Sequence, residues 1–149
     1  MVTRTLLTAA FALLATAAIA EPLEFSSDEG PALNIARNLM TQERGEAFSE
    51  GETVTVALVD LDGDGTRDLF AFADASYFCG SAGCIPRLYR LEASTAKWLE
   101  LPIVSEATIN GEPAMWTVGE PDSSGWRTLE FHNDVVTLVF HWDGEAYVN

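Results

Sequence analysis

Basic residues are scarce in this sequence. Eight lysines and arginines stand against 23 aspartates and glutamates, and the 149-residue chain has a formal net charge of −15 at pH 7. Nucleic acids and anionic membranes both require a positively charged protein surface. We therefore expect neither of them as a partner, and we expect cations or basic proteins to be attracted instead.

Several catalytic and repeat signatures are missing as well. The chain contains no nucleophile elbow, no zinc-binding His-x-x-x-His helix and no phosphate-cradling glycine loop. It has no internal repeat, which excludes a propeller built from this chain alone. The only two histidines, His132 and His141, are interpreted as ordinary surface residues. These absences favour a protein that is not an enzyme.

No apolar run is long enough for a membrane helix. The N-terminal run follows the single positive charge of Arg4 and ends at Ala18-Ile19-Ala20, which is shorter than the ~18 to 20 residues that a membrane span requires. This pattern is typical of a secretory signal peptide. No cysteine follows it that would carry a lipid anchor. We expect a signal peptide at residues 1–20 and a single periplasmic or secreted domain at residues 21–149, without a membrane anchor.

Cysteine occurs only twice. Cys79 and Cys84 enclose four residues, and in an exported protein with no other thiol they are expected to form a disulfide. A redox-active pair more commonly encloses two residues. The Cys-Gly-Ser start is similar to the papain-type nucleophile motif, but Ala82 stands where that motif has a second cysteine. A disulfide-bonded sulfur also has no free thiolate to act as a nucleophile.

The most distinctive stretch is an acidic loop that reads Asp-Leu-Asp-Gly-Asp-Gly-Thr-Arg-Asp at residues 60–68. Carboxylates recur at every second position, and a glycine permits the sharp turn that brings them around one centre. Hard oxygen ligands of this kind suit Ca²⁺. The sequence therefore predicts a calcium site in which four carboxylates and one backbone carbonyl, that of the threonine, are the ligands: Asp60, Asp62, Asp64, Thr66 and Asp68.

This loop departs from the helix-loop-helix calcium hand. Ala71 stands at the twelfth loop position, where that hand requires a bidentate glutamate. The preceding β-branched segment, residues 53–59, predicts a strand, so the loop joins two strands. It resembles the calcium-binding hairpin loop of FG-GAP repeats in integrin-type propellers, in which an aspartate at the ninth position completes the coordination, here Asp68. The resemblance covers residues 54–73 and implies calcium binding rather than an activity.

Two other interpretations of the loop remain open. It is also compatible with an acidic, glycine-rich surface turn that holds no ion. Asp60 and Asp62 are similar in spacing to the Asp-x-Asp nucleophile of haloacid-dehalogenase-type phosphatases, which would make the protein a metal-dependent phosphohydrolase. That family continues with threonine or valine and a large apolar residue, whereas Gly63 follows here, and the alternation of strands and helices is missing.

Periodicity predicts one helix followed by strands. Apolar residues recur at three- and four-residue spacing over Pro31–Glu46, which predicts an amphipathic helix. From Thr53 onward β-type segments alternate with turn signals, so we expect an α+β fold that is mainly an antiparallel β meander with one N-terminal helix. The predicted strands are residues 54–59, 68–73, 85–91, 97–101, 114–118, 126–132, 135–142 and 145–148. Pairing across Asn133-Asp134 places Leu129 and Phe131 on the same face as Phe140.

A second resemblance spans residues 54–148. The order of a strand, the acidic loop, a hydrophobic strand, the Cys-x4-Cys loop and a closing Trp142-Asp143-Gly144-x-x-Tyr147 hairpin is similar to a group of small exported proteobacterial proteins, mostly without assigned function. The resemblance implies a fold and a compartment.

These observations favour a small exported, calcium-binding, disulfide-stabilised binding module without catalysis of its own. The alternative is a periplasmic inhibitor or immunity protein for a basic cell-wall hydrolase, because an acidic surface speeds encounters with basic proteins. A metal-dependent phosphohydrolase is the third hypothesis.

Overall fold

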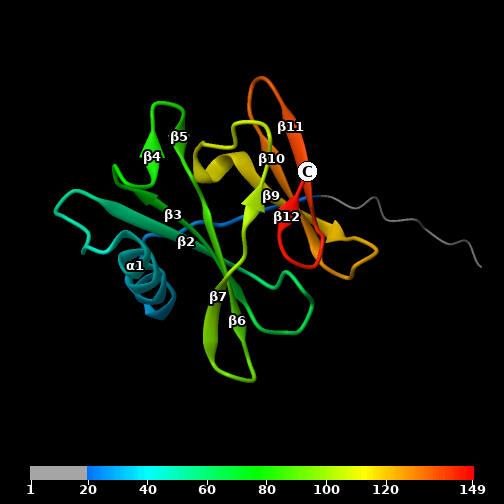
Figure 1. Ribbon diagram of the computed structural model, residues 1–149, viewed down its shortest axis with the longest axis horizontal. Helices are drawn as coiled ribbons and strands as arrows, with labels where there is room; N and C mark the ends of the chain where they lie inside the picture. Colours follow the sequence, from blue (N-terminus) through cyan, green and yellow to red (C-terminus); the bar gives the residue numbers. More distant parts are fainter. Residues whose placement is uncertain (1–19) are drawn as a thin grey trace, which may run out of the picture.

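The protein consists of two main β-sheets and one α-helix (Figure 1). This computed structural model describes residues 20–149. The elements are β1 (Glu21–Pro22), α1 (Pro31–Arg44), β2 (Thr53–Val59), β3 (Asp68–Asp74), β4 (Cys79–Gly80), β5 (Gly83–Cys84), β6 (Arg87–Glu92), β7 (Lys97–Glu100), β8 (Ile103–Val104), the 3₁₀ turn η1 (Pro113–Met115), β9 (Trp116–Pro121), β10 (Arg127–His132), β11 (Thr137–Trp142) and β12 (Tyr147–Val148). The predicted α+β class is confirmed. The predicted signal peptide lies outside the described residues, apart from Ala20.

A proline and a glycine define the two ends of helix α1. Pro31 occupies its first turn, where a missing N–H costs nothing. Gly45 follows the last helical residue with a φ of 83°, and its N–H donates to the carbonyl of Thr41 over 2.8 Å. The helix therefore stops two residues before the predicted Glu46. Its apolar stripe packs on β2 and β3 through three buried side chains: Leu33, Ala36 and Met40.

A four-stranded sheet lies in the middle of the molecule, with the strand order β2-β3-β6-β7. Strand β3 of this sheet is buried on both faces, and a strand buried in this way has a continuous run of apolar residues. Leu69, Ala71 and Ala73 pack with helix α1. Phe70 and Phe72 point the other way, into the core shared with the second sheet. Because its side chains alternate between the two faces of the sheet, β3 packs against helix α1 on one face and against the second sheet on the other.

The second sheet has the strand order β1-β9-β10-β11-β12-β8. The predicted register of its central hairpin is confirmed, because Leu129 pairs with Phe140 and Phe131 pairs with Leu138. One contact departs from the antiparallel meander: β8 pairs with β12 in parallel. Four short strands were not predicted, namely β1, β4, β5 and β8, because two residues are too few to show a period.

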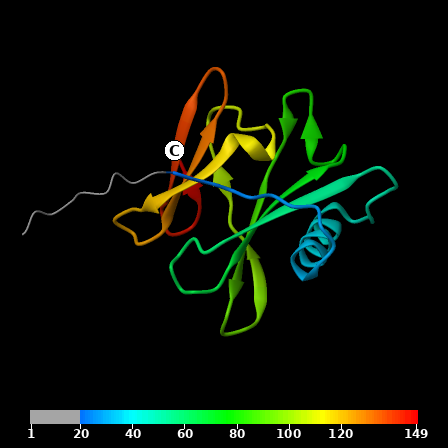
Figure 2. The ribbon, with the colours of Figure 1, turned by 180° about the vertical axis from the view of Figure 1, so that it is seen from behind.

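The two sheets pack face to face around a largely aromatic core. The ring centroids of Trp116 and Phe70, one from each sheet, lie 5.2 Å apart at an interplanar angle of 78°. Viewed from behind, the N-terminal segment crosses from the six-stranded sheet to helix α1 (Figure 2). Over residues 20–149, no helix is long and apolar enough to cross a membrane.

Candidate metal centre

The acidic loop is the turn of the β2–β3 hairpin. Seven consecutive residue pairs join the two strands, from Thr53 opposite Asp74 to Val59 opposite Asp68. The turn bends through Gly63 and Gly65, whose φ angles of 73° and 84° lie in the left-handed region that favours glycine. A regular hairpin therefore fixes both ends of the loop, as the pattern of a strand on each side predicts.

Three of the predicted ligands converge. The carboxylates of Asp60, Asp62 and Asp64 each offer an oxygen, and these oxygens lie within 4.8 Å of one another. Backbone amides hold them in place: Gly63 and Gly65 donate to the two oxygens of Asp60 over 2.8 and 3.0 Å. Like charges this close repel by roughly 1 kcal/mol per pair even in water. The arrangement is therefore favourable for a cation.

Asp68 lies behind this group rather than within it. Its side chain is buried, with an exposed fraction of 1% for the residue, and its Oδ2 accepts a hydrogen bond from the Leu61 amide over 3.1 Å. Burial raises the pKa of Asp68 to about 7, and the charges of Asp62 and Asp64 add to that rise. In the structure, the Asp68 carboxylate thus holds the Leu61 backbone through a hydrogen bond. Its ligation of an ion stays a prediction.

Thr66 stands next to the three converging carboxylates. Its backbone N–H donates to Asp64 over 2.6 Å, and this hydrogen bond lowers the pKa of the Asp64 carboxyl. The predicted ligand atom is the carbonyl oxygen of Thr66, and its ligation also stays a prediction.

Sequence reasoning missed Arg90, which supplies a positive charge beside the loop. Arg90 lies on β6, next to β3 in the sheet, and its guanidinium contacts the Asp62 carboxylate at 2.6 Å. It covers Asp62, whose side chain is only 7% exposed, and it lies over the ring of Trp126 at 5.3 Å from the centroid. No local pattern reveals this contact, because strand pairing creates it.

Leu61 fastens the loop to the second sheet. Its side chain is fully buried in the core between the sheets, although its neighbours on both sides are aspartates. Its carbonyl accepts a hydrogen bond from the Arg127 amide over 2.7 Å, and the Tyr147 hydroxyl donates to the Arg127 carbonyl over 2.9 Å. An apolar residue between two predicted ligands is the sequence signal that could have indicated this anchor.

The predicted disulfide is confirmed. Cys79 and Cys84 are bonded across the two-stranded β4–β5 hairpin, with Cα atoms 3.9 Å apart. Asp74 lies close to both sulfurs. Because the sulfurs are joined to each other, they offer no thiolate to a metal, so this second cluster is not a candidate metal site.

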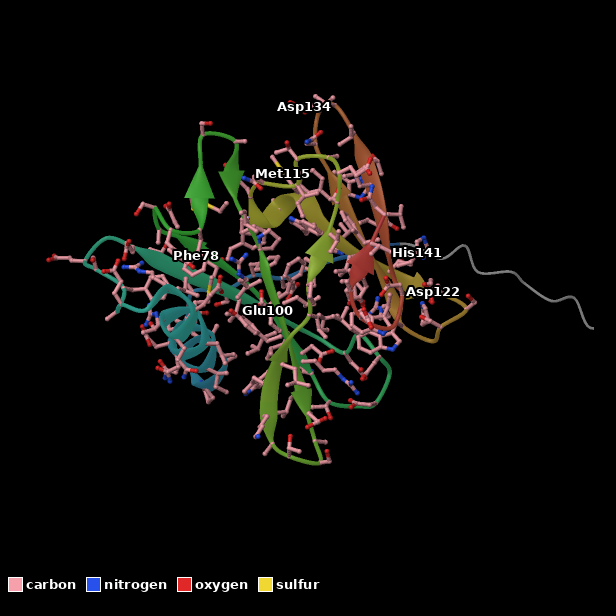
Figure 3. The ribbon with its side chains drawn as sticks, in the orientation of Figure 1. Phe78, Glu100, Met115, Asp122, Asp134 and His141 are labelled. Carbon is pink, nitrogen blue, oxygen red and sulfur yellow. A yellow bond between two sulfur atoms is a disulfide. The ribbon has the colours of Figure 1, made fainter. Side chains whose placement is uncertain are left out.

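The two histidines have different partners. His132 lies beside Glu130 at 3.2 Å, and His141 lies beside Asp122 at 3.0 Å. Figure 3 shows His141 and Asp122 together at the surface, on the strand and loop of the six-stranded sheet. The side chain of His132 is 41% exposed and that of His141 is 55% exposed. This agrees with their interpretation as surface residues.

Comparisons of the chain with protein-family models, with curated proteins and with solved structures found no match. The similarity to FG-GAP loops and to small exported proteins therefore stays a prediction from the motifs, and the proposed function depends on the geometry of the loop.

Proposed function

We propose that this protein is a small exported binding module, without catalysis of its own, whose β2–β3 hairpin is clamped by one calcium ion. The observation that supports this most directly is the convergence of Asp60, Asp62 and Asp64 within 4.8 Å at the end of a regular hairpin. Calcium takes six to eight oxygen ligands. The Thr66 carbonyl, Asp68 and water would supply the rest of the shell.

The local charge balance also favours a divalent ion. Four carboxylates belong to the loop, and Arg90 is paired with only one of them, Asp62. A calcium ion would offset the remaining repulsion and draw the loop together. An affinity of ~10⁻⁴ to 10⁻³ M is typical of extracellular calcium modules, and we expect this range here.

Export is supported by the disulfide. A bond between Cys79 and Cys84 forms and persists in oxidising compartments such as the periplasm or the extracellular space. Calcium is abundant outside the cell, so an ion of modest affinity would be bound there. Both stabilising features therefore suit the same location.

Calcium should raise the melting temperature of the metal-free protein. With dissociation constants in the expected range, 10 mM calcium stabilises by about 1.4 to 2.7 kcal/mol, which corresponds to roughly 5 to 12 °C for a domain of this size. The measurement is thermal unfolding followed by circular dichroism, in EDTA and over a calcium titration. Sodium chloride of equal ionic strength separates specific binding from screening.

The variant Asp62→Asn with Asp64→Asn should lose this response. Asparagine keeps the oxygens that accept the amides of Asp64 and Thr66, so the loop retains its hydrogen bonds while it loses two charges. The control is Asp28→Asn with Asp134→Asn, two exposed aspartates outside the loop. A calcium response that survives in the loop variant would refute the proposed site.

A further inference from the structure

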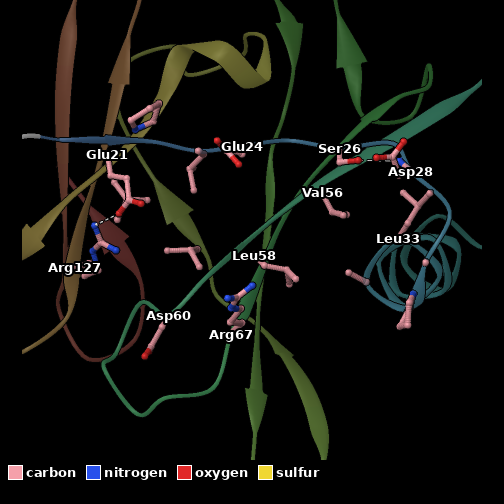
Figure 4. A pocket seen from close by; sticks show the side chains of 17 residues that line it. Glu21, Glu24, Ser26, Asp28, Leu33, Val56, Leu58, Asp60, Arg67 and Arg127 are labelled. Carbon is pink, nitrogen blue, oxygen red and sulfur yellow. Dashed lines mark hydrogen bonds and ion pairs between the residues drawn. The ribbon is translucent and has the colours of Figure 1, made fainter.

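A cleft of about 600 Å³ opens between the N-terminal segment and β2 (Figure 4). It extends from Asp60, at the start of the acidic loop, to Leu33 in the first turns of α1. Leu58 and Arg67 both line it, and Figure 4 shows their labelled side chains below the N-terminal segment. Small-molecule and cofactor sites commonly have volumes of ~300 to 1,000 Å³. This volume therefore suits a ligand of a few residues.

The course of the N-terminal segment creates the cleft. Ser26 and Val56 exchange two backbone hydrogen bonds of 2.9 Å, so the segment begins to pair with the outer edge of β2. Four residues earlier, Pro22 is already paired with Thr117 in β9 of the other sheet. The segment has to leave β2 between these two points in order to reach the second sheet. Within residues 20–149, the segment therefore pairs with β2 only at Ser26 and Val56.

Leu58 lies at the uncovered part of this edge. Backbone hydrogen-bonding directions alternate along an antiparallel strand, so the N–H and C=O of Leu58 point to the same side as those of Val56. Continued pairing would place Glu24 opposite Leu58, but the segment has turned away there. Among residues 20–149, no backbone partner outside the sheet is found for either group of Leu58. Two main-chain groups therefore face the cleft.

Apolar side chains line the base of the cleft. Four side chains at the base are buried to 7% exposure or less, and Leu58 adds an apolar side chain that is 44% exposed. The four buried side chains are Leu33, Val56, Val59 and Val118. A ligand in this cleft would cover the Leu58 side chain, and the apolar surface removed from water would favour binding.

The rim of the cleft carries more acids than bases. One of its two arginines, Arg127, is already paired with Glu21 at 3.2 Å and donates to the Gly119 carbonyl. Arg67 is the other. Glu24 and Asp28 are exposed on the rim beside the N-terminal segment. Together with the net charge of the chain, this balance favours a cationic ligand.

We propose that this cleft binds a short, extended peptide with alternating apolar and basic side chains, which adds to the β2 edge at Leu58. The inference rests on the proposed function in that it names what the binding module would bind. Main-chain hydrogen bonds to Leu58 provide affinity, apolar side chains cover its exposed surface, and basic side chains face Glu24 and Asp28. An exposed segment of a basic exported protein has this chemistry.

The probe is the peptide acetyl-Val-Lys-Val-Lys-Val-amide, titrated into ¹⁵N-labelled protein in 5 mM calcium. We expect saturable binding, with amide shifts at Leu58, at the adjacent Val59 and at Ser26, which pairs with Val56. The charge-reversed peptide, in which glutamate replaces lysine, should bind at least tenfold more weakly. Equal binding of both peptides, or shifts confined to other surfaces, would overturn the proposal.

The matched variants are Leu58→Lys and Leu99→Lys. Leu58 and Leu99 lie on the two edge strands of the same sheet and are 44% and 42% exposed, so each change replaces an equally accessible leucine. Leu58→Lys should weaken the lysine peptide at least tenfold, because it removes the apolar contact and adds a positive charge. Leu99→Lys should change its dissociation constant less than twofold. The reverse result would place the site at the β7 edge and refute the proposal.

Failure of this inference can be told apart from failure of the calcium site. The titration is repeated in EDTA and with the Asp62→Asn, Asp64→Asn variant. If calcium raises the melting temperature and neither peptide binds, the peptide cleft is refuted and the calcium site stands. If the lysine peptide binds at Leu58 and calcium has no effect on melting, the cleft stands and the calcium site is refuted.

Discussion

At the scale of single residues, Asp68 is the most perturbed group of the candidate site. Its carboxyl is buried at the foot of the acidic loop, and burial raises its pKa from the ordinary 3.8 to about 7. The folded protein without calcium therefore binds a proton at Asp68 more tightly than the unfolded chain does. The resulting stabilisation is complete below pH 4, and it is lost as the pH rises through about 7.

The variant Asp68→Asn isolates this effect. Asparagine remains neutral at every pH and keeps an oxygen to accept the Leu61 amide. In EDTA, we expect the variant to be more stable than the parent at pH 8 and to change less between pH 5 and pH 8. Urea unfolding at both pH values measures the difference. Identical pH dependence in the two proteins would show that Asp68 keeps its ordinary pKa.

Together with the Thr66 hydrogen bonds, Arg90 lowers the pKa of Asp64, whereas burial raises that of Asp68. Its contact with Asp62 places a positive charge beside the loop and lowers the pKa of Asp64 after the larger effects of the Thr66 hydrogen bonds. One arginine offsets only part of the charge of four carboxylates. The protein therefore supplies part of the compensation itself, and the proposed calcium ion would supply the rest.

At the scale of elements, the β2–β3 and β4–β5 hairpins are stabilised in different ways. The β2–β3 hairpin has seven residue pairs and a fully buried anchor, Leu61. The β4–β5 hairpin has only two pairs, and a disulfide closes it. Cys84 and Gly111 exchange two backbone hydrogen bonds, which dock the short hairpin on the segment before η1. The disulfide thus substitutes for the strand length that β4 and β5 lack.

Gly83 shows how closely this docking brings two backbones together. Its φ of 110° favours glycine, and a Cβ at this position would lie 2.8 Å from the Cα of Gly111. The short hairpin therefore depends on a glycine as well as on the disulfide.

Removal of the disulfide should loosen this hairpin without affecting the acidic loop. For Cys79→Ser with Cys84→Ser, closure of so short a loop predicts a loss of about 2 kcal/mol in the free energy of unfolding. Hydrogen exchange at the Cys84 and Gly111 amides of the parent should become faster after reduction. The calcium-dependent rise in melting temperature should persist in the serine variant, and its disappearance would show that the two hairpins are coupled.

At the scale of the whole molecule, charge is unevenly compensated. Five of the arginines are paired with carboxylates in residues 20–149: Arg37, Arg44, Arg87, Arg90 and Arg127. Because acidic residues outnumber basic ones by 15 in the full chain, many carboxylates have no positive partner. Their mutual repulsion opposes the compact state, and salt screens it.

Sodium chloride should therefore stabilise the metal-free protein. In EDTA at pH 8, we expect the melting temperature to rise by several degrees between low salt and ~0.5 M, where the Debye length falls to roughly 4 Å. The further gain from 10 mM calcium should persist in 0.15 M sodium chloride, because an ion held by converging carboxylates does more than screen. A calcium effect that vanishes at this salt concentration would indicate general screening instead of a site.

Much of the fold follows from local patterns. The stripe of α1 and the alternation along β10 and β11 predicted a helix, the strands and the Leu129–Phe140 register, because each depends on neighbours within one or two elements. The apolar run of β3 also predicted a strand, but not that two layers cover it. The assignment of strands to two sheets depends on contacts between distant segments, which periodicity does not contain.

The sequence by itself determined the acidic loop, its place in a hairpin and the Cys79–Cys84 pair, because spacing along the chain is enough to bring these groups together. Only the tertiary structure decided that Asp68 is buried, that Arg90 covers Asp62 and that the β2 edge is open at Leu58. Each of these depends on which strand, sheet or segment lies alongside, and packing of the whole chain selects those neighbours.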